Sequence, residues 1–90
     1  QGPQFMLQCV RSSDAVVLAW TCRVAGAAAY RVMRWNAVEE RWLVVAERGV
    51  GESTYLDPIS LDAPAPRYQV LALSASGDEI AISPSVGPNA

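Results

Sequence analysis

Histidine is absent from this 90-residue sequence, and all seven of its basic residues are arginine. Without histidine, no Ser–His or Cys–His nucleophile pair can be built. The sequence also has only two cysteines, and two ligands without histidine or further cysteine do not complete a zinc site. We therefore expect neither nucleophilic catalysis of these kinds nor a bound metal or cofactor.

Long apolar runs and basic clusters are missing as well. No apolar stretch approaches the roughly 20 residues that a membrane-spanning helix needs, and no signal peptide is visible. The formal net charge is −2, with no basic run, so the sequence lacks the positive surface that attracts nucleic acid or an anionic membrane. We therefore expect a processed chain that binds no nucleic acid and does not insert into a membrane.

The sequence does contain segments whose residues would alternate between two sides of an extended strand, most clearly residues 14–22, DAVVLAWTC. One side of this segment carries Val16, Leu18, Trp20 and Cys22, and the other carries Val17, Ala19 and Thr21. A period of two with β-branched residues and one large aromatic predicts a half-buried strand. Trp20 is the largest apolar side chain on the inward side, so we expect other strands to pack around it.

Six further segments are predicted as short strands: residues 4–10, 29–35, 41–47, 53–57, 67–74 and 79–83. Turns separate them at short intervals, and no convincing helix is present. This pattern predicts an all-β fold, a seven-stranded, immunoglobulin-like β-sandwich. We assign the domain to residues 4–86 and a linker or terminus to residues 87–90. Residues 1–3 resemble the remnant of a protease site used to remove tags and are excluded.

The two cysteines lie on the first two predicted strands. These strands can form an antiparallel hairpin around residues 11–14, which could bring Cys9 close to Cys22 on the inner side. Two interpretations stay open at this stage. The pair consists of two small buried thiols, or it forms a cross-strand disulfide.

Several motifs occur in the order and spacing of a known module. They are Leu18-Ala19-Trp20, Tyr30-Arg31-Val32, Tyr68-Gln69-Val70 and residues 42–46, 53–57 and 75–79. Together they span nearly the whole chain and resemble a fibronectin type III module, in the variety common in bacterial secreted enzymes and surface proteins. The resemblance implies that the third and sixth strands are neighbours, and that the module is a spacer beside catalytic or binding domains.

The sequence departs from this family in two places. The family has a tyrosine corner, a Tyr that opens the sixth strand and hydrogen-bonds back to the crossover. Counting from Leu61 puts Tyr68 about one residue late, and counting back from Gly77 puts the corner on Pro66, but we assign it to Tyr68. The family does not usually carry the two cysteines. No Arg-Gly-Asp triplet is present, so integrin binding is not supported.

Strand parity predicts an apolar patch on the outer side of the second sheet. If the core holds Trp20, Tyr30, Val32, Tyr68, Val70 and Ala72, the alternate residues must point outward. These outward residues are Met33, Trp35, Leu71 and Leu73, which Trp42 or Leu43 could extend. Patches of this kind often mark interaction sites. Alternatively, the stems of Arg31, Arg34 and Arg67 cover the patch, or a neighbouring module does.

Acidic residues do not change the expectation that the chain is not an enzyme. They lie mostly at predicted turns and strand ends: Asp14, Glu39, Glu40, Glu52, Asp57, Asp62, Asp78 and Glu79. Paired carboxylates can hydrolyse glycosidic bonds, but a sandwich of this size offers no deep cleft for them. Gly49 and Gly51 make too weak a pattern for a phosphate loop.

We therefore predict a non-catalytic module of a larger protein, extracellular or at the cell surface. It would space its neighbours and bind a protein partner or neighbouring domain through Met33, Trp35, Trp42, Leu71 and Leu73. One alternative is a carbohydrate-binding accessory module of a secreted polysaccharide-degrading enzyme, in which Trp35 and Trp42 stack on sugar rings if they are coplanar and exposed. Another is an intracellular scaffold module, which free thiols would favour and a disulfide would oppose.

Overall fold

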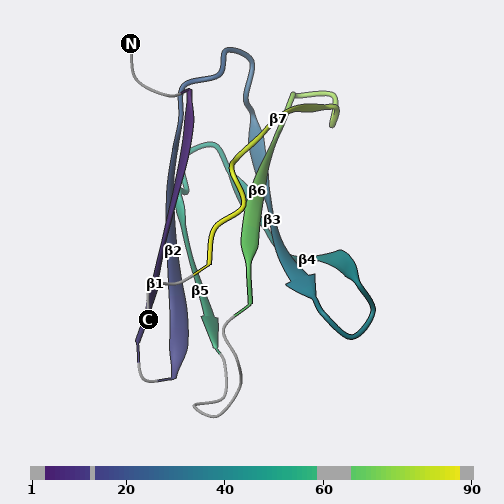
Figure 1. Ribbon diagram of the computed structural model, residues 1–90. Coiled ribbons are helices and arrows are strands. Elements are labelled where there is room, and N and C mark those ends of the chain that lie inside the picture. The colour runs from purple at the N-terminus through teal and green to yellow at the C-terminus, as the bar shows by residue number, and fades with distance from the viewer. Residues whose placement is uncertain (1–3, 13, 59–65, 88–90) are drawn as a thin grey trace.

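The computed structural model describes residues 4–12, 14–58 and 66–87. These residues contain seven strands, which turns and loops connect (Figure 1). They are β1 (Phe5–Arg11), β2 (Ala15–Cys22), β3 (Ala29–Asn36), β4 (Arg41–Gly49), β5 (Thr54–Pro58), β6 (Tyr68–Leu73) and β7 (Glu79–Ile82). These residues contain no helix, and therefore none that is long and apolar enough to cross a membrane. Residues 1–3, the end of the predicted linker and the crossover with Leu61 and Pro64 lie outside the described residues.

The strands form two antiparallel sheets that face each other (Figure 1). A three-stranded sheet has the order β1-β2-β5, and a four-stranded sheet has the order β4-β3-β6-β7. The prediction of an all-β, seven-stranded sandwich is confirmed. β3 pairs with β6, as the resemblance implied, and β4 extends the sheet on the other side of β3.

The core lies between the sheets and follows the predicted alternation. Val16 and Leu18 are fully buried, and Trp20 packs edge-on against Tyr30 with 5.6 Å between ring centroids. The indole Nε1 of Trp20 is buried without a hydrogen-bond partner among the described residues. The buried cluster comprises Phe5, Leu7, Cys9, Val16, Leu18, Trp20, Tyr30, Val32, Tyr68, Val70 and Ala72. All six residues predicted to fill the core therefore do so.

Strand register explains why the two cysteines are free. Cys9 lies opposite Leu18, whereas Cys22 lies opposite Phe5, four positions further along the hairpin. That offset is roughly 13 Å along the strand, far beyond the spacing that a disulfide can bridge. The prediction of a hairpin is correct, but the suggested Cys9–Cys22 disulfide is not formed.

A tight turn joins β3 to β4 and sets the residues on either side of it. The side-chain oxygen of Asn36 accepts hydrogen bonds from the backbone N–H groups of Val38 and Glu39, both at 2.9 Å. This capping of the turn by an Asn side chain is a common local device, and Glu40 completes the turn with a φ of 55°. The turn places Trp35 directly opposite Trp42.

Candidate functional site

The outer side of the four-stranded sheet gathers the five residues predicted to bind a partner. The register pairs Met33 with Val44 and Trp35 with Trp42, while Leu71 and Leu73 follow on β6. Leu43 pairs with Arg34 and so points the other way, which leaves Trp42 as the residue that extends the surface. We call this surface the aromatic face: Met33, Trp35, Trp42, Val44, Leu71, Leu73 and Ile82.

Exposure on the aromatic face is lower than parity suggested. Leu71 is only 7% exposed and Leu73 only 6%, so the expectation that both are open to solvent is wrong. They lie on β6 between two neighbouring strands, and Leu71 has Arg31 on one side and Ile82 on the other. Met33 and both tryptophans are half-buried. The open part of this face is therefore its β4 side and Ile82, and the use of its residues for partner binding stays a prediction.

The three arginines expected to cover the patch behave differently from one another. Arg31 lies on the aromatic face and pairs with Glu47 at 3.2 Å. Arg34 points between the sheets instead, and Arg67 reaches sideways to the hydroxyl and carbonyl oxygens of Ser85. Of the three, only Arg31 is held across this face by an ion pair.

Trp35 and Trp42 pack against each other edge-to-face, with 5.4 Å between ring centroids and 66° between ring planes. This geometry is a favoured one for aromatic pairs. It does not form the coplanar platform that stacking on two consecutive sugar rings would require. The pair can offer the face of one indole to one ring.

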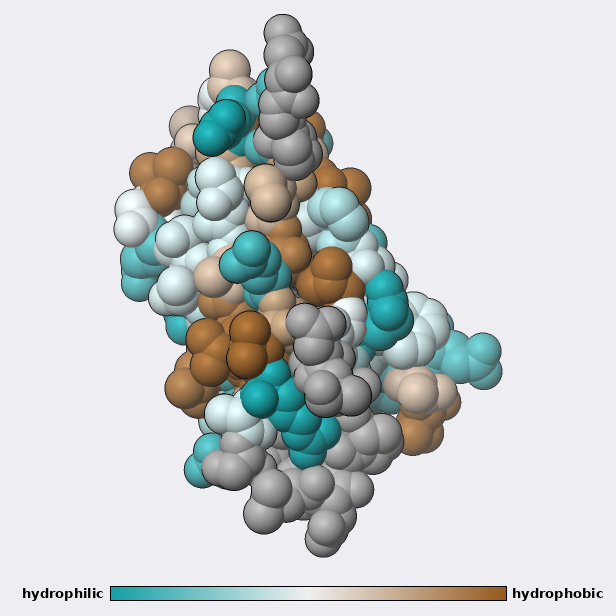
Figure 2. All heavy atoms as spheres, turned by 60° about the vertical axis from the view of Figure 1, so that its left-hand side comes forward, coloured by the Kyte–Doolittle hydropathy of each residue, from teal (hydrophilic) through white to brown (hydrophobic). Residues whose placement is uncertain are grey.

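The outer side of the three-stranded sheet carries a second apolar surface, which sequence reasoning missed. Val10 lies opposite Val17, and Val17 lies opposite Leu56. Their exposed fractions are 60%, 40% and 56%. We call these three residues the aliphatic row. Figure 2 turns this side of the molecule forward and shows hydrophobic side chains clustered below its middle. Parity along residues 14–22 already pointed Val17 outward, but only the register places the other two beside it.

A buried charged group joins the two sheets at one end of the core. Asp57 on β5 is 3% exposed, and its two carboxylate oxygens each accept a hydrogen bond from Arg34 Nη1 at 2.9 Å. The Tyr68 hydroxyl donates to the same carboxylate. Tyr68, the residue assigned to the tyrosine corner, thus opens β6 and reaches back to the end of β5. Sequence reasoning placed Asp57 at a strand end without a role, because its partners are distant in the chain.

The electrostatics of this group make it a structural link rather than a proton donor or acceptor. Burial, then the hydrogen bond to Asp57, raises the pKa of Tyr68 far above its ordinary value. Burial would lower the pKa of Arg34, but the hydrogen bonds and charge of Asp57 outweigh this effect and raise it. Arg34 and Tyr68 therefore stay protonated near neutral pH.

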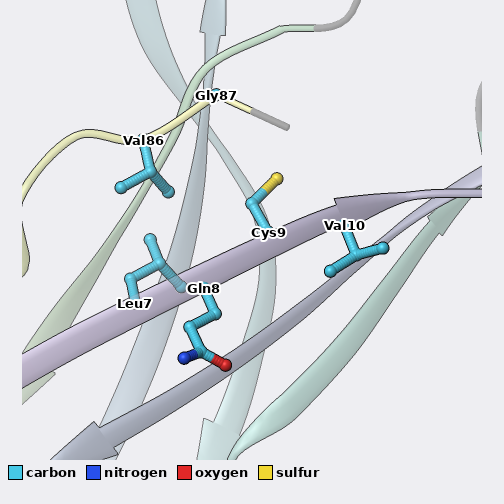
Figure 3. Close-up of a pocket in the computed structure, with 6 residues that line it drawn as sticks. All are labelled: Leu7, Gln8, Cys9, Val10, Val86 and Gly87. Atoms are coloured by element: carbon cyan, nitrogen blue, oxygen red, sulfur yellow. The ribbon is translucent and has the colours of Figure 1, made fainter. Parts of the chain in front are cut away.

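A groove of about 300 Å³ runs beside β1 and is lined by Leu7, Gln8, Cys9, Val10, Val86 and Gly87 (Figure 3). Figure 3 shows the Cys9 thiol pointing to the side where Val86 and Gly87 lie. Burial, and then the charge of Asp57, raises the pKa of Cys9 to about 11. The thiol is therefore neutral at ordinary pH and a poor nucleophile. Among the described residues no cluster of His, Cys, Asp and Glu could hold a metal ion.

Comparison with known proteins connects this sandwich with one part of longer enzymes. No protein-family model matches the sequence, and neither does any curated protein. Among solved structures, the chain resembles pectate lyase PelI from Erwinia chrysanthemi, with 20% identity, a TM-score of 0.77, and coverage of 94% of this chain and 27% of that one. The same enzyme in complex with tetragalacturonic acid matches at a TM-score of 0.73, with 20% identity and coverage of 94% and 28%.

A second enzyme gives the same result. Pectate lyase Pel3 from Pectobacterium carotovorum matches at 19% identity and a TM-score of 0.74, with coverage of 94% of this chain and 27% of that one. The chain therefore spans a little over a quarter of the length of these structures. At this identity the likeness establishes the fold, and the fold is that of a domain within a larger chain.

Proposed function

We propose that this chain is a non-catalytic module of the fibronectin type III kind, acting as an accessory domain of an exported polysaccharide-degrading enzyme. The observation that carries the proposal is the fold match, in which almost the whole chain resembles a small part of two pectate lyases. A domain occupying that share of an enzyme leaves the remainder for the catalytic machinery. The motifs described in the sequence analysis support the same kind of module from the sequence alone.

The chemistry of the described residues supports a non-catalytic role. The buried carboxylate of Asp57 is held by Arg34 and Tyr68, which occupy both of its oxygens. The Cys9 thiol keeps its proton up to about pH 11. Histidine is absent from the sequence. The buried carboxylate and the buried thiol are thus committed to structure, and we propose binding as the function of this domain.

Acidic pectic chains are the ligand class that we propose, because PelI is described in complex with tetragalacturonic acid. The contact would be the Trp35–Trp42 pair, whose free indole face can pack on one pyranose ring. Arg67 is the neighbour of Trp35 on β6, since the Trp35 N–H donates to the Arg67 carbonyl at 2.9 Å. The Arg67 guanidinium hydrogen-bonds to Ser85 in the free chain, and on binding it would turn to the carboxylate of a uronic acid, which its planar fork suits.

Tryptophan fluorescence during titration with tetragalacturonate, and separately with a neutral glucan oligosaccharide, tests this proposal. We expect a saturable change with the acidic sugar that is lost in Trp42→Ala and weakened by added salt, because an Arg–carboxylate contact is screened. Val44→Ala, on the same strand and side, is the matched control and should leave binding intact. No response to either sugar would remove the sugar contact and favour a spacer.

The aliphatic row favours a second function, contact with a neighbouring domain. Val10, Val17 and Leu56 are adjacent across three strands and more exposed than any comparable set on the aromatic face. Contiguous exposed apolar residues are typical of interaction surfaces. In a longer chain, a domain packed on this row would slow digestion of the connecting segment by protease, and Val17→Asp would speed it.

Extracellular location belongs to the same proposal, since the enzyme would act on a polysaccharide outside the cell. The free cysteines do not oppose it. The register keeps Cys9 and Cys22 too far apart to bond to each other in any compartment. Their reduced state therefore does not favour the intracellular scaffold over an exported module.

A further inference from the structure

β1 differs from the other strands that lie at sheet edges. β4 carries Arg41, Glu47 and Arg48, and β5 is short and ends at Pro58. β7 has only four residues, with an irregular register against β6. Charges, prolines, short length and bulges are the devices by which proteins protect an edge from pairing with another strand. From Phe5 to Val10, β1 has none of them: it is uncharged, lacks proline and pairs regularly.

The hydrogen-bond pattern shows which backbone groups β1 leaves open. The Arg23 N–H donates to the Gln4 carbonyl at 2.6 Å, and the Ser12 N–H donates to the Ala15 carbonyl at 2.9 Å. In an antiparallel ladder, hydrogen-bonded and non-hydrogen-bonded residue pairs alternate. Since Gln4 and Ser12 belong to hydrogen-bonded pairs, the backbone groups of the even-numbered residues of β1 bond to β2. The N–H and C=O groups of Leu7 and Cys9 therefore face away from β2, and among the described residues β2 is the only strand that pairs with β1.

The described residues leave a space beside this edge. The groove of about 300 Å³ follows β1 from Leu7 to Val10, with Val86 and Gly87 on its other side (Figure 3). On the outer side, Met6 and Val10 are exposed next to the edge. An extended strand laid along β1 would thus find unpaired backbone groups and apolar side chains on the outer side and in the groove.

We propose that β1 pairs with β1 of a second copy of this chain, antiparallel and centred on Gln8. The strand is self-complementary about that residue. Leu7 of one copy meets Cys9 of the other on the inner side, and Met6 meets Val10 on the outer side. Arg11 falls opposite Phe5, so no like charges face each other. The pairing joins the two three-stranded sheets into one and extends each aliphatic row by the Met6 of the other copy.

The size of the contact determines how tightly the copies associate. One pair of edge strands buries less than the roughly 1,200 Å² of a standard stable interface. The dimer is therefore weak and forms in concentrated protein. A strand from a different protein could use the same open groups, but the symmetry of β1 about Gln8 specifically suits a second copy.

Amide hydrogen exchange of the wild-type chain at increasing protein concentration tests the pairing directly. The amides of Leu7 and Cys9 face the open edge, so their exchange should slow several-fold as the concentration rises. The amides of Met6 and Gln8 already bond to β2 and should exchange at a constant rate, which makes them internal controls. Exchange at Leu7 and Cys9 that is independent of concentration overturns self-pairing and leaves the edge to a strand of another protein.

Cysteine cross-linking tests the register. Gln8 would face its own counterpart as a non-hydrogen-bonded pair, with about 4.5 Å between Cα atoms, which is within disulfide range. In a Cys22→Ser background, Gln8→Cys should give a reducible covalent dimer on mild oxidation. Met6→Cys is the matched control: its counterpart lies four positions away, so it should stay monomeric, while Met6→Cys with Val10→Cys should cross-link. Equal cross-linking of the Gln8→Cys and Met6→Cys variants, or none in the former, overturns the proposal.

Discussion

The outer sides of the two sheets are both apolar, yet they expose their residues to very different degrees. On the aromatic face, Leu71 and Leu73 are almost fully buried, and Trp35 and Trp42 cover part of each other. On the three-stranded sheet, the residues of the aliphatic row are between 40% and 60% exposed. The four-stranded sheet thus has the larger apolar residues on its outer side but exposes fewer of them than the three-stranded sheet does.

The difference comes from strand position and side-chain length. β6 has a neighbour on each side, and long residues such as Arg31 and Ile82 flank its leucines. In the narrower sheet, β1 and β5 are edges and only β2 has two neighbours. The short side chain of Val17 cannot shield Val10 or Leu56. Apolar content and parity therefore predict which side a residue faces, whereas neighbours decide how far it is buried.

Removing the Asp57 carboxylate, which links the two sheets, should lower the free energy of unfolding more than any other change proposed here. Asp57→Ala leaves Arg34 and the Tyr68 hydroxyl without their partner, and breaking a buried ion pair costs about 3–5 kcal/mol. We expect the lower end, because the Arg34 side chain is 34% exposed. Urea unfolding measures the loss. Tyr68→Phe removes one hydrogen bond and should cost less, so the reverse order would contradict a central role for the carboxylate.

Truncating one leucine on each outer side compares the two directly. Leu71→Ala should lower the free energy of unfolding by about 2–3 kcal/mol, since it empties a buried site. Leu56→Ala should change it by no more than about 0.5 kcal/mol, as is usual for exposed positions. Chemical denaturation of both variants in the same buffer gives the comparison. Equal costs would mean that the two outer sides are energetically alike.

Alkaline pH should lower the free energy of unfolding through Cys9, a residue on the inner side of the three-stranded sheet. The pKa of Cys9 rises from 9.0 to about 11 on folding. Between these values the folded chain holds more protons than the unfolded chain, so stability is full below pH 9 and declines as pH rises towards 11. The slope is up to about 1.4 kcal/mol per pH unit.

Denaturation at several pH values, in wild type and in Cys9→Ala, measures this slope. The variant should lose most of the decline up to about pH 10, above which the raised pKa of Tyr68 adds to it. Cys22→Ala is the matched control and should behave like the wild type. An unchanged slope in Cys9→Ala would assign the alkaline loss to another group.

The contact between Trp35 and Trp42 is expected to make the smallest contribution to the free energy of unfolding. A double-mutant cycle with Trp35→Ala and Trp42→Ala should give a coupling of about 0.5–1.5 kcal/mol, as measured for other aromatic pairs. The same cycle on Val17 and Leu56 should give a coupling near zero, because each stays largely hydrated. Similar coupling in both cycles would mean that the aliphatic row is as well packed as the aromatic pair.

Strand-level features were predictable from sequence because they depend on local alternation. Val16, Leu18 and Trp20 follow a period of two, and the structure buries all three. The turn at Asn36 is local as well, since the same residue caps it with its own side chain. Membership of one face was also predictable for Met33 and Trp35 from parity along one strand, whereas the choice between Trp42 and Leu43 needed the observed register across the hairpin.

Properties that depend on register between distant strands could not be predicted in this way. Nothing in the sequence shows that Asp57 meets Arg34 and Tyr68, which lie 23 and 11 residues away. The sequence predicted that the two cysteine-bearing strands form a hairpin. The offset of four positions, which prevents a Cys9–Cys22 disulfide, is known only from the observed pairing of β1 with β2. The aliphatic row needed the registers of two strand pairs at once.

The amino-acid sequence by itself determined the seven strands, their inward residues and the lack of histidine-based chemistry, because each follows from composition or from short-range periodicity. The tertiary structure decided which outward residues are open to solvent, which strand edge is unpaired among the described residues, and where the buried carboxylate of Asp57 finds its partners. These depend on neighbours supplied by remote segments. Exposure and pairing are properties of the packed sheets, and the residues that create them are far apart in the chain.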